Sequence, residues 1–324
     1  MSFTILTKQS ILLAITLLII TSCNTKTKPI KVGYLPIAEC LPLYVAKEKG
    51  FFEKHGLEVE LVSEPNGPTV FQEIDAGAID IGFSNVVTLI SQTNAGKSYK
   101  SIFGATYETV SNVNHSVFGR ANENISLENA VFGINAHKNI EELMLINFLN
   151  SKGVKISNSI QSQFKVIPFP QMLSALSDKE IDYACIVEPG ITRALSDTAR
   201  YKYVGNHYPV TPESKVLVAT YVSTDKNIKN SPIEIEKFVN AMIEATDYIN
   251  GGNKDMRNFI MIYSKIPENL INKMSLPEFA KTIDKEGIEK IAQLMYDPII
   301  NINNSFISNP SNKLEFNSIV YRIK

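Results

Sequence analysis

Short apolar runs alternate with longer amphipathic segments along the first third of the chain. The apolar runs predict strands over residues 31–34, 57–61, 79–83 and 99–107. The segments between them predict helices over residues 42–49, 68–76 and 86–94, each followed closely by a glycine that acts as a usual helix stop. Strands that alternate with helices of this length predict a mostly parallel sheet covered on both faces.

The same pattern begins again near residue 130. Strands are expected over residues 130–134, 163–167 and 182–187, with helices over 139–152 and 170–176 and from Ile191 onward. The stretches IDAGAIDIGFSNVVTLI and LSDKEIDYACIVEPGITRAL share an Ile-Asp pair entering a strand, then a polar turn, then a helix. This internal similarity fits two domains of one architecture.

Two extended segments, at residues 114–122 and 215–225, bracket this second half. They predict that the chain crosses from one lobe to the other and later returns, so that the two crossings form a hinge. We therefore expect a first lobe of residues 30–113 plus 219–324 and a second lobe of residues 114–218. The predicted fold class is α/β, with two doubly wound lobes joined by two hinge crossings.

The C-terminal third carries a different pattern. Ser231, Pro232 and Glu234 predict a helix start with a capping box, and an apolar stripe at helical spacing continues to Ile249. A helix packed on a core explains this stripe. Further short helices are expected over residues 270–274 and 288–295, and the asparagine-rich residues 301–317 are expected to form a loop.

The N-terminus has the features of a secretory signal. Lys8 precedes an apolar run over residues 11–20, which is shorter than the ~20 residues of a spanning helix but has the length of a signal-peptide core. The following IITSC resembles the lipobox of bacterial lipoproteins, in which the cysteine, here Cys23, is lipidated. We expect residues 1–22 to be a signal peptide and residues 23–29 a tether to a lipid anchor outside the cytoplasm, in the periplasm or on the outer face of the cytoplasmic membrane. An ordinary cleaved signal peptide is the alternative.

The composition narrows the range of partners. A net charge of −1 over 324 residues gives no electrostatic reason to expect nucleic acid as a partner. The chain has no tryptophan, so aromatic contacts must come from tyrosine or phenylalanine. Besides Cys23, the cysteines are Cys40 and Cys185. A disulfide between them is chemically possible outside the cytoplasm, but burial as two small hydrophobic side chains is the interpretation that we favour.

Several stretches carry a family resemblance. VGYLPIAECLPLYVAKEKGFFEKHGLEVELV followed by DAGAIDIGFSN resembles the substrate-binding proteins of ABC importers for nitrate, sulfonates, taurine and thiamine precursors, a group related in fold to the thiamine-pyrimidine synthases. FGINAHKNIEELMLINFLNSKGV and VIPFPQMLSALSDKEIDYACIVEPGITRA are similar to the second lobe of these proteins. The resemblance covers about residues 31–249. It implies a type II periplasmic-binding-protein fold, a ligand between the lobes, and delivery of that ligand to ABC permease subunits.

The loops that follow the strands are the expected binding site, because ligands of open α/β sheets bind outside the carboxyl ends of the strands. Each lobe supplies two such loops, as a cleft requires. Helix N-termini in these loops offer free N–H groups, and tyrosine rings offer stacking surfaces. The residues expected to bind the ligand are Tyr34, Pro36, Glu39, Ser84, Asn85, Tyr107, Asn135, His137 and Glu188.

Several of these residues also have a purely structural interpretation. Asn85 and Asn135 can cap helices, His137 can be solvated on its loop, and Glu188 can brace its turn or pair across the hinge. Two acids beside the site, Glu39 and Glu188, would oppose a simple oxyanion. We therefore expect a small nitrogen- or sulfur-containing solute, and a neutral or cationic heterocycle stacked on an aromatic ring is our hypothesis.

An enzyme is the main alternative function, since the pyrimidine synthases that the family resembles in fold are enzymes. Here, however, the four histidines are scattered, and no Ser/His/Asp order, zinc-ligand cluster or glycine-rich phosphate loop is visible. We expect no catalytic residue, no cofactor and no metal. A sensor that presents its ligand to a membrane partner is a second alternative, and a monomer is the expected state.

Overall fold

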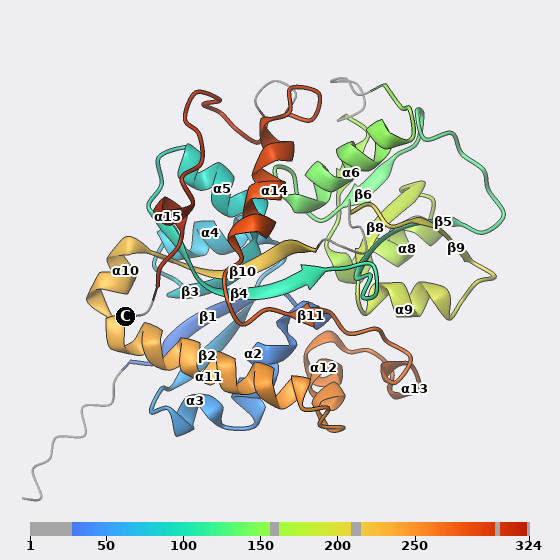
Figure 1. The fold of residues 1–324 in the computed structure, drawn as a ribbon. Coiled ribbons are helices and arrows are strands. Elements are labelled where there is room, and N and C mark those ends of the chain that lie inside the picture. The colour runs from blue at the N-terminus through green and yellow to red at the C-terminus, as the bar shows by residue number, and fades with distance from the viewer. Residues whose placement is uncertain (1–27, 156–161, 209–214, 302–304, 323–324) are drawn as a thin grey trace, which may run out of the picture.

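Two β-sheets organise the part of the chain that the structure describes, residues 28–155, 162–208, 215–301 and 305–322. In this computed structural model each sheet has its own set of helices, and the two sets occupy different sides of the molecule (Figure 1). We call the first sheet with its helices the first lobe, and the second sheet with its helices the second lobe. The expected signal peptide, residues 1–22, and the expected lipidation site Cys23 lie outside the described residues.

The first sheet is mixed. It contains β1 (Ile30–Tyr34), β2 (Val59–Ser63), β3 (Ile81–Asn85), β4 (Tyr99–Glu108), β10 (Val216–Thr224) and β11 (Glu278–Phe279), in the order β11-β4-β10-β3-β1-β2. β1 runs parallel to β2 and β3, whereas β10 runs antiparallel to β3 and β4. The expected parallel arrangement therefore holds for β2, β1 and β3, and the returning strand β10 breaks it.

Helices cover both faces of the first sheet, with α2 (Leu41–Glu48) and α11 (Pro232–Asn250) on one face and α5 (Val86–Asn94) and α14 (Lys285–Tyr296) on the other (Figure 1). The apolar stripe of α11 is buried, as its spacing predicts. The remaining helices of this lobe are η1 (Ala38–Cys40), α3 (Phe51–Lys54), α4 (Gly67–Asp75), α10 (Asp225–Asn230), α12 (Met256–Ser264), α13 (Glu268–Ile271) and α15 (Phe316–Ile319).

The second sheet has the order β7-β6-β8-β5-β9. Its central strand β8 alternates between two apolar layers: Tyr183, Cys185 and Val187 join the main core with α6, whereas Ala184 and Ile186 join a separate cluster with α8 and α9. The elements are β5 (His115–Arg120), β6 (Phe132–Ile134), α6 (Ile140–Ser151), β7 (Phe164–Val166), η2 (Phe169–Gln171), α8 (Met172–Ser177), β8 (Tyr183–Val187), α9 (Gly190–Leu195) and β9 (Tyr201–Gly205).

The chain passes between the lobes twice. It leaves the first sheet after β4 and enters the second at β5, across residues 109–114, and it returns between β9 and β10 through residues that are partly outside the described ranges. The sequence predicts β4 before the first crossing, β5 after it and β10 after the second crossing, whereas β9, which precedes the second crossing, was not predicted. The exact lobe boundaries, 30–113 plus 219–324 and 114–218, stay predictions.

Two local expectations need correction. α11 begins at Pro232 as predicted, but the side chain of Ser231 makes no capping hydrogen bond. Ser231 also ends α10, and its ψ of 51° is not the extended conformation that a capping side chain needs. The residues expected to form only a loop near the C-terminus include the short helix α15.

Cys40 and Cys185 are both free and buried, as the composition suggested. No disulfide therefore joins the two lobes at these positions. Across the described ranges, no helix is long and apolar enough to cross a membrane.

Candidate ligand-binding cleft

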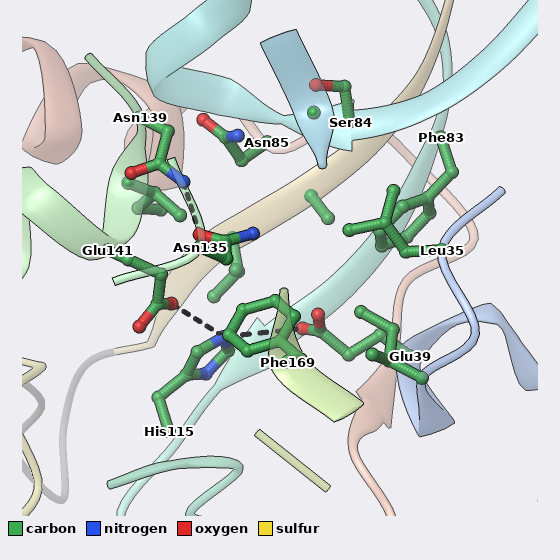
Figure 2. Close-up of a pocket in the computed structure, with 15 residues that line it drawn as sticks. Leu35, Glu39, Phe83, Ser84, Asn85, His115, Asn135, Asn139, Glu141 and Phe169 are labelled. Carbon is green, nitrogen blue, oxygen red and sulfur yellow. Dashed lines mark hydrogen bonds and ion pairs between the residues drawn. The ribbon is translucent and has the colours of Figure 1, made fainter. Parts of the chain in front are cut away.

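A small cavity lies where the two lobes meet (Figure 2). Its open volume is about 30 Å³, which is enough room for one or two water molecules. The first lobe contributes Leu35, Ile37, Glu39, Gly67, Phe83, Ser84, Asn85, Val218 and Ala219, and the second contributes His115, Asn135, Asn139, Ile140, Glu141 and Phe169. Several of these residues follow the carboxyl ends of β1, β3 and β6, which is where the architecture places ligands.

The first-lobe wall is held by the end of β3 and the start of α4. Asn85 ends β3 and caps α5, because its Oδ1 accepts hydrogen bonds from the backbone nitrogen of Thr88 at 2.9 Å and from its hydroxyl at 3.1 Å. The neighbouring Ser84 is buried, and its hydroxyl has no partner among the described residues. Gly67 faces both, since a Cβ added there would lie 2.5 Å from Ser84 Oγ and 2.7 Å from Asn85 Nδ2.

The second-lobe wall is the start of α6. Asn139 caps this helix by accepting a hydrogen bond from the backbone of Glu142 at 3.1 Å, and its amide donates to Asn135 Oδ1 at 2.6 Å. Asn135 therefore has its amide nitrogen turned toward the cavity (Figure 2). Glu141 lies in the first turn of α6, in the same wall, and is 1% exposed.

A buried cluster of charged side chains forms the base of the cavity. His115 begins β5, and its Nδ1 lies 2.9 Å from Oε2 of Glu108 at the end of β4. Its Nε2 faces the other way, 3.5 Å from Oε1 of Glu141 and 3.8 Å from Oε1 of Glu39 (Figure 2). The hydroxyl of Thr106 donates to Glu39 at 2.9 Å. One imidazole thus faces carboxylates of both lobes.

The cluster perturbs the protonation of its members. Burial alone would lower the pKa of His115, but Glu39, Glu108 and Glu141 raise this pKa to about 9. Burial raises the pKa of Glu39. Burial would also raise the pKa of Glu141, but the neighbouring His207 and His115 hold it below its usual value. With this pKa, His115 is an imidazolium at neutral pH and carries an N–H on both ring nitrogens, of which Nδ1 donates to Glu108.

A family model described as the NMT1-like family matches residues 24–262, about three quarters of the chain. The chain belongs to the NMT1-like family. The resemblance inferred from the sequence is thereby confirmed at the level of the family, and solved structures confirm the fold. A ligand-binding component of an ABC-type import system from Staphylococcus aureus has a TM-score of 0.73 at 17% identity, covering 91% of this chain and 97% of that one. The aliphatic sulphonate-binding protein SsuA of Escherichia coli has a TM-score of 0.68 at 15% identity, covering 91% and 97%.

Curated relatives of this NMT1-like chain match over part of their length. A nitrate import ATP-binding protein, NrtC of Synechocystis, is 27% identical over 73% of this chain and 37% of the relative. A bicarbonate transport ATP-binding protein, CmpC of Synechococcus elongatus, is 27% identical over 49% of this chain and 26% of the relative. The chain therefore spans well under half the length of these relatives.

Four of the residues predicted from the sequence line the cavity: Glu39, Ser84, Asn85 and Asn135. A second cavity of about 90 Å³ lies beside the first, and Pro36 lines it. Phe169 lines both cavities.

The other predicted residues lie elsewhere in this structure. Tyr34 packs edge-on against Tyr44, and the ammonium of Lys215 sits 3.8 Å from the ring centre of Tyr107. His137 has a half-exposed side chain that contacts Glu142 at 3.2 Å. None of these rings lines the cavity in the described residues, so their part in ligand binding stays a prediction.

The carboxylate of Glu188 stabilises the turn that contains this residue. This is one of the two structural interpretations that the sequence allowed for Glu188. Its carboxylate accepts hydrogen bonds from the backbone nitrogen of Thr192 at 3.0 Å and from its hydroxyl at 2.9 Å. Burial raises the pKa of Glu188 to about 7, and the bonds from Thr192 oppose this rise. Its backbone carbonyl accepts from the backbone nitrogen of Ala38 at 3.1 Å, so the turn also touches the first lobe.

Sequence reasoning missed His115, Glu141 and Phe169. Glu141 could have been found from the composition of its helix. Most residues of α6 are buried, so an acid within it is also buried and needs polar partners. His115 gave no comparable signal, because its three carboxylate neighbours come from separate elements.

Proposed function

We propose that this chain is the solute-binding component of an ABC importer, which captures a small molecule between its lobes and delivers it to permease subunits outside the cytoplasm. The observation that carries the proposal is the cavity whose walls come from both lobes, with buried polar side chains turned toward it. A ligand held there touches both lobes at once, so it favours the closed arrangement over an open one.

The comparisons support this proposal. The names of the relatives and of the solved structures refer to import and binding, for nitrate, bicarbonate and sulphonates among others. The expected solute for this chain is a nitrogen- or sulfur-containing small molecule, and the expected form of the protein is a monomer that does no chemistry on its ligand.

Anchoring at Cys23 is part of the proposal. Residues 24–28 are polar and give the folded lobes a short tether beyond the lipidated cysteine. Several acyl chains on one residue are enough for stable attachment to a membrane. In cells that express the full chain, the protein should sediment with membranes, and Cys23→Ser should release it or leave its precursor unprocessed. Equal distribution of the two forms would contradict the anchor.

A thermal-shift screen of small nitrogen and sulfur compounds tests the binding function. A ligand that binds only the folded protein raises its melting temperature, and small-angle scattering should then report a smaller radius of gyration for the bound protein. Asn135→Leu should abolish both effects, while Asn150→Leu, at an exposed position of α6 outside the cavity, serves as the matched control. A screen with no stabilising compound, or binding that Asn135→Leu leaves intact, would contradict the proposal.

A further inference from the structure

We infer that a buried cluster beside the two crossings is a proton-sensitive switch, which favours the closed arrangement of the lobes while His115 is protonated and weakens it when His115 loses its proton. We call this group of side chains the hinge cluster. Its members are Glu39, Glu108, His115, Glu141, His207 and Tyr208. The inference concerns how the lobes open and close in the absence of a solute, so it goes beyond the solute binding proposed above.

The hinge cluster connects the two crossings to each other. His115 directly follows the first crossing, and His207 and Tyr208 lie in the second. Oε2 of Glu141, on α6, lies 3.0 Å from Nε2 of His207, and its Oε1 accepts a hydrogen bond from the hydroxyl of Tyr208 at 3.3 Å. The same Oε1 lies 3.5 Å from Nε2 of His115, whose ring centre is 4.3 Å from that of Tyr208. A rotation of the lobes about the two crossings therefore acts directly on this cluster.

One contact of the hinge cluster depends on how the lobes are arranged. Glu39 belongs to η1 of the first lobe and accepts a hydrogen bond from Thr106 of the first sheet at 2.9 Å, whereas His115 belongs to the second sheet. Oε1 of Glu39 lies 3.8 Å from Nε2 of His115 at the base of the cleft (Figure 2). Glu108, in contrast, is seven residues from His115 along the chain, contacts it at 2.9 Å and also accepts a hydrogen bond from the backbone nitrogen of Asn114. Opening of the lobes therefore separates His115 from Glu39 but leaves Glu108 beside it.

Histidine supplies every cation in the hinge cluster. Across the described residues, the ion pairs of Glu39, Glu108 and Glu141 are all with His115 or His207. All five side chains are buried, with exposed fractions of 5% or less. Buried carboxylates are costly unless a cation compensates them. Because a histidine loses its charge with one proton, the compensation here depends on pH, unlike the permanent charge of an arginine.

The direction of the switch follows from these contacts. Burial alone would lower the pKa of His115, but Glu39, Glu108 and Glu141 raise it to about 9. Opening removes the contribution of Glu39, so His115 holds its proton more tightly when the lobes are closed. Burial also raises the pKa of Glu39, and opening exposes this side chain to water, since it lines the cavity between the lobes. Both groups therefore bind protons more strongly in the closed arrangement. Closure is favoured at neutral pH and is opposed as the pH rises through about 9.

Small-angle scattering of the full-length protein without solute tests the inference, from pH 6.5 to about one unit above the pKa of His115. The radius of gyration of the wild type should increase with pH as the lobes open. His115→Gln should have the larger radius at every pH, since an amide carries no charge. Glu39→Gln should show less than about half of the wild-type increase, because it lacks the acid that opening separates from His115. His55→Gln is the matched control: its imidazole pairs with Glu244 within the first lobe, so its radius should follow that of the wild type.

Circular dichroism over the same pH range separates opening from unfolding, because a rotation of two rigid lobes leaves the helix content unchanged. A radius that stays constant in the wild type overturns the inference, and so does an increase that coincides with loss of helix. Equal increases in the wild type and in Glu39→Gln also overturn it. Glu39→Gln retains a side-chain oxygen for the hydrogen bond from Thr106, so its result decides the question if His115→Gln does not fold. Solute binding is measured separately by the melting-temperature screen, so either proposal can fail while the other stands.

Discussion

The imidazole of His115 and the carboxylate of Glu39 lie 3.8 Å apart, from Nε2 to Oε1, and this pair joins the two lobes at the base of the cleft. Both side chains are buried. His115 belongs to the first strand after the first crossing, whereas Glu39 lies in the short helix η1 that follows β1. Any opening of the cleft that separates the lobes there would pull apart two buried, oppositely charged groups.

His115→Gln should destabilise the protein strongly. The substitution leaves Glu39 and Glu108 buried without their imidazolium partner, while Glu141 keeps its contact with His207 at 3.0 Å; breaking a buried ion pair in this way costs about 3–5 kcal/mol. Urea unfolding at pH 7 measures the effect. His55→Gln is the control, since its pair with Glu244 is partly exposed and worth less. A loss below about 1 kcal/mol would contradict the role assigned to the cluster.

Stability should fall as the pH rises from neutral to alkaline values. The pKa of His115 is raised from 6.5 to about 9 in the folded protein, so its contribution is fully present below pH 6.5 and is lost as the pH rises through 9. A shift of this size corresponds to about 3 kcal/mol of unfolding free energy. Unfolding curves between pH 6.5 and 9 should show this decline in the wild type and a smaller one in His115→Gln. If stability declined equally with pH in the wild type and in His115→Gln, His115 would not be the group responsible for the decline.

Local signals predicted most of the fold. Helix α5 has the predicted bounds because Asn85 caps its start and Gly96, two residues after its last residue, adopts a φ of 87° that ends the helix. The strands β1, β3 and β8 were found because buried apolar runs of this length have few alternatives. The capping box at Ser231 failed because the preceding helix α10 fixes the backbone of that residue, which the sequence does not reveal.

The site was predicted where it lies at the end of a strand or in the segment that directly follows one, as Glu39 does after β1. Ser84, Asn85 and Asn135 line the cavity. They could be predicted because the strand order of the backbone alone places the ligand site at the carboxyl ends of the strands. Glu141 and His115 were missed, because their place in the site depends on which way side chains turn in three dimensions. Glu141 and Glu142 are neighbours in sequence, yet the first faces the cavity and the second faces His137. Pattern alone does not separate two such residues.

Glu188→Gln should remove a second pH dependence. Burial raises the pKa of Glu188 from 4.5 to about 7, so the folded protein holds this proton more tightly than the unfolded chain. The associated stability is present below pH 4.5 and is lost as the pH rises through 7. Unfolding curves from pH 4.5 to 7 should be flatter for Glu188→Gln than for the wild type. The control is Glu180→Gln, whose exposed pair with Lys165 should leave the slope unchanged; an equal slope in all three proteins would refute the prediction.

Arg193→Ala should favour the open arrangement of the lobes. The guanidinium of Arg193, on α9 of the second lobe, donates to the carbonyl of Lys265 at 2.8 Å and to that of Ser264 at 3.4 Å, at the end of α12 in the first lobe. Loss of these bonds should weaken ligand binding by about tenfold, the worth of one or two hydrogen bonds. Titration and small-angle scattering of the ligand-saturated protein measure this. Arg200→Ala, at an exposed site, should behave as wild type. Unchanged affinity and scattering in Arg193→Ala would exclude a role in closure.

Gly67→Ala should impair binding with little loss of stability. A Cβ at this position would come within 2.5 Å of Ser84 Oγ and 2.7 Å of Asn85 Nδ2, closer than real Cβ atoms approach, so both polar groups must move and the cavity must change shape. Gly67 is the first residue of α4, and the two closest atoms belong to side chains and not to the backbone, so the strain is relieved mainly by movement of Ser84 and Asn85.

The two effects can be measured separately. Titration should show binding weakened tenfold or more, while the melting temperature of the free protein stays within a few degrees of the wild type, since about 1 kcal/mol shifts it by only that much. Gln72→Ala, on the exposed side of the same helix, should change neither quantity. If Gly67→Ala bound ligand as tightly as the wild type, the ligand would have to sit away from Ser84, and the cavity described here would lose its place as the binding site.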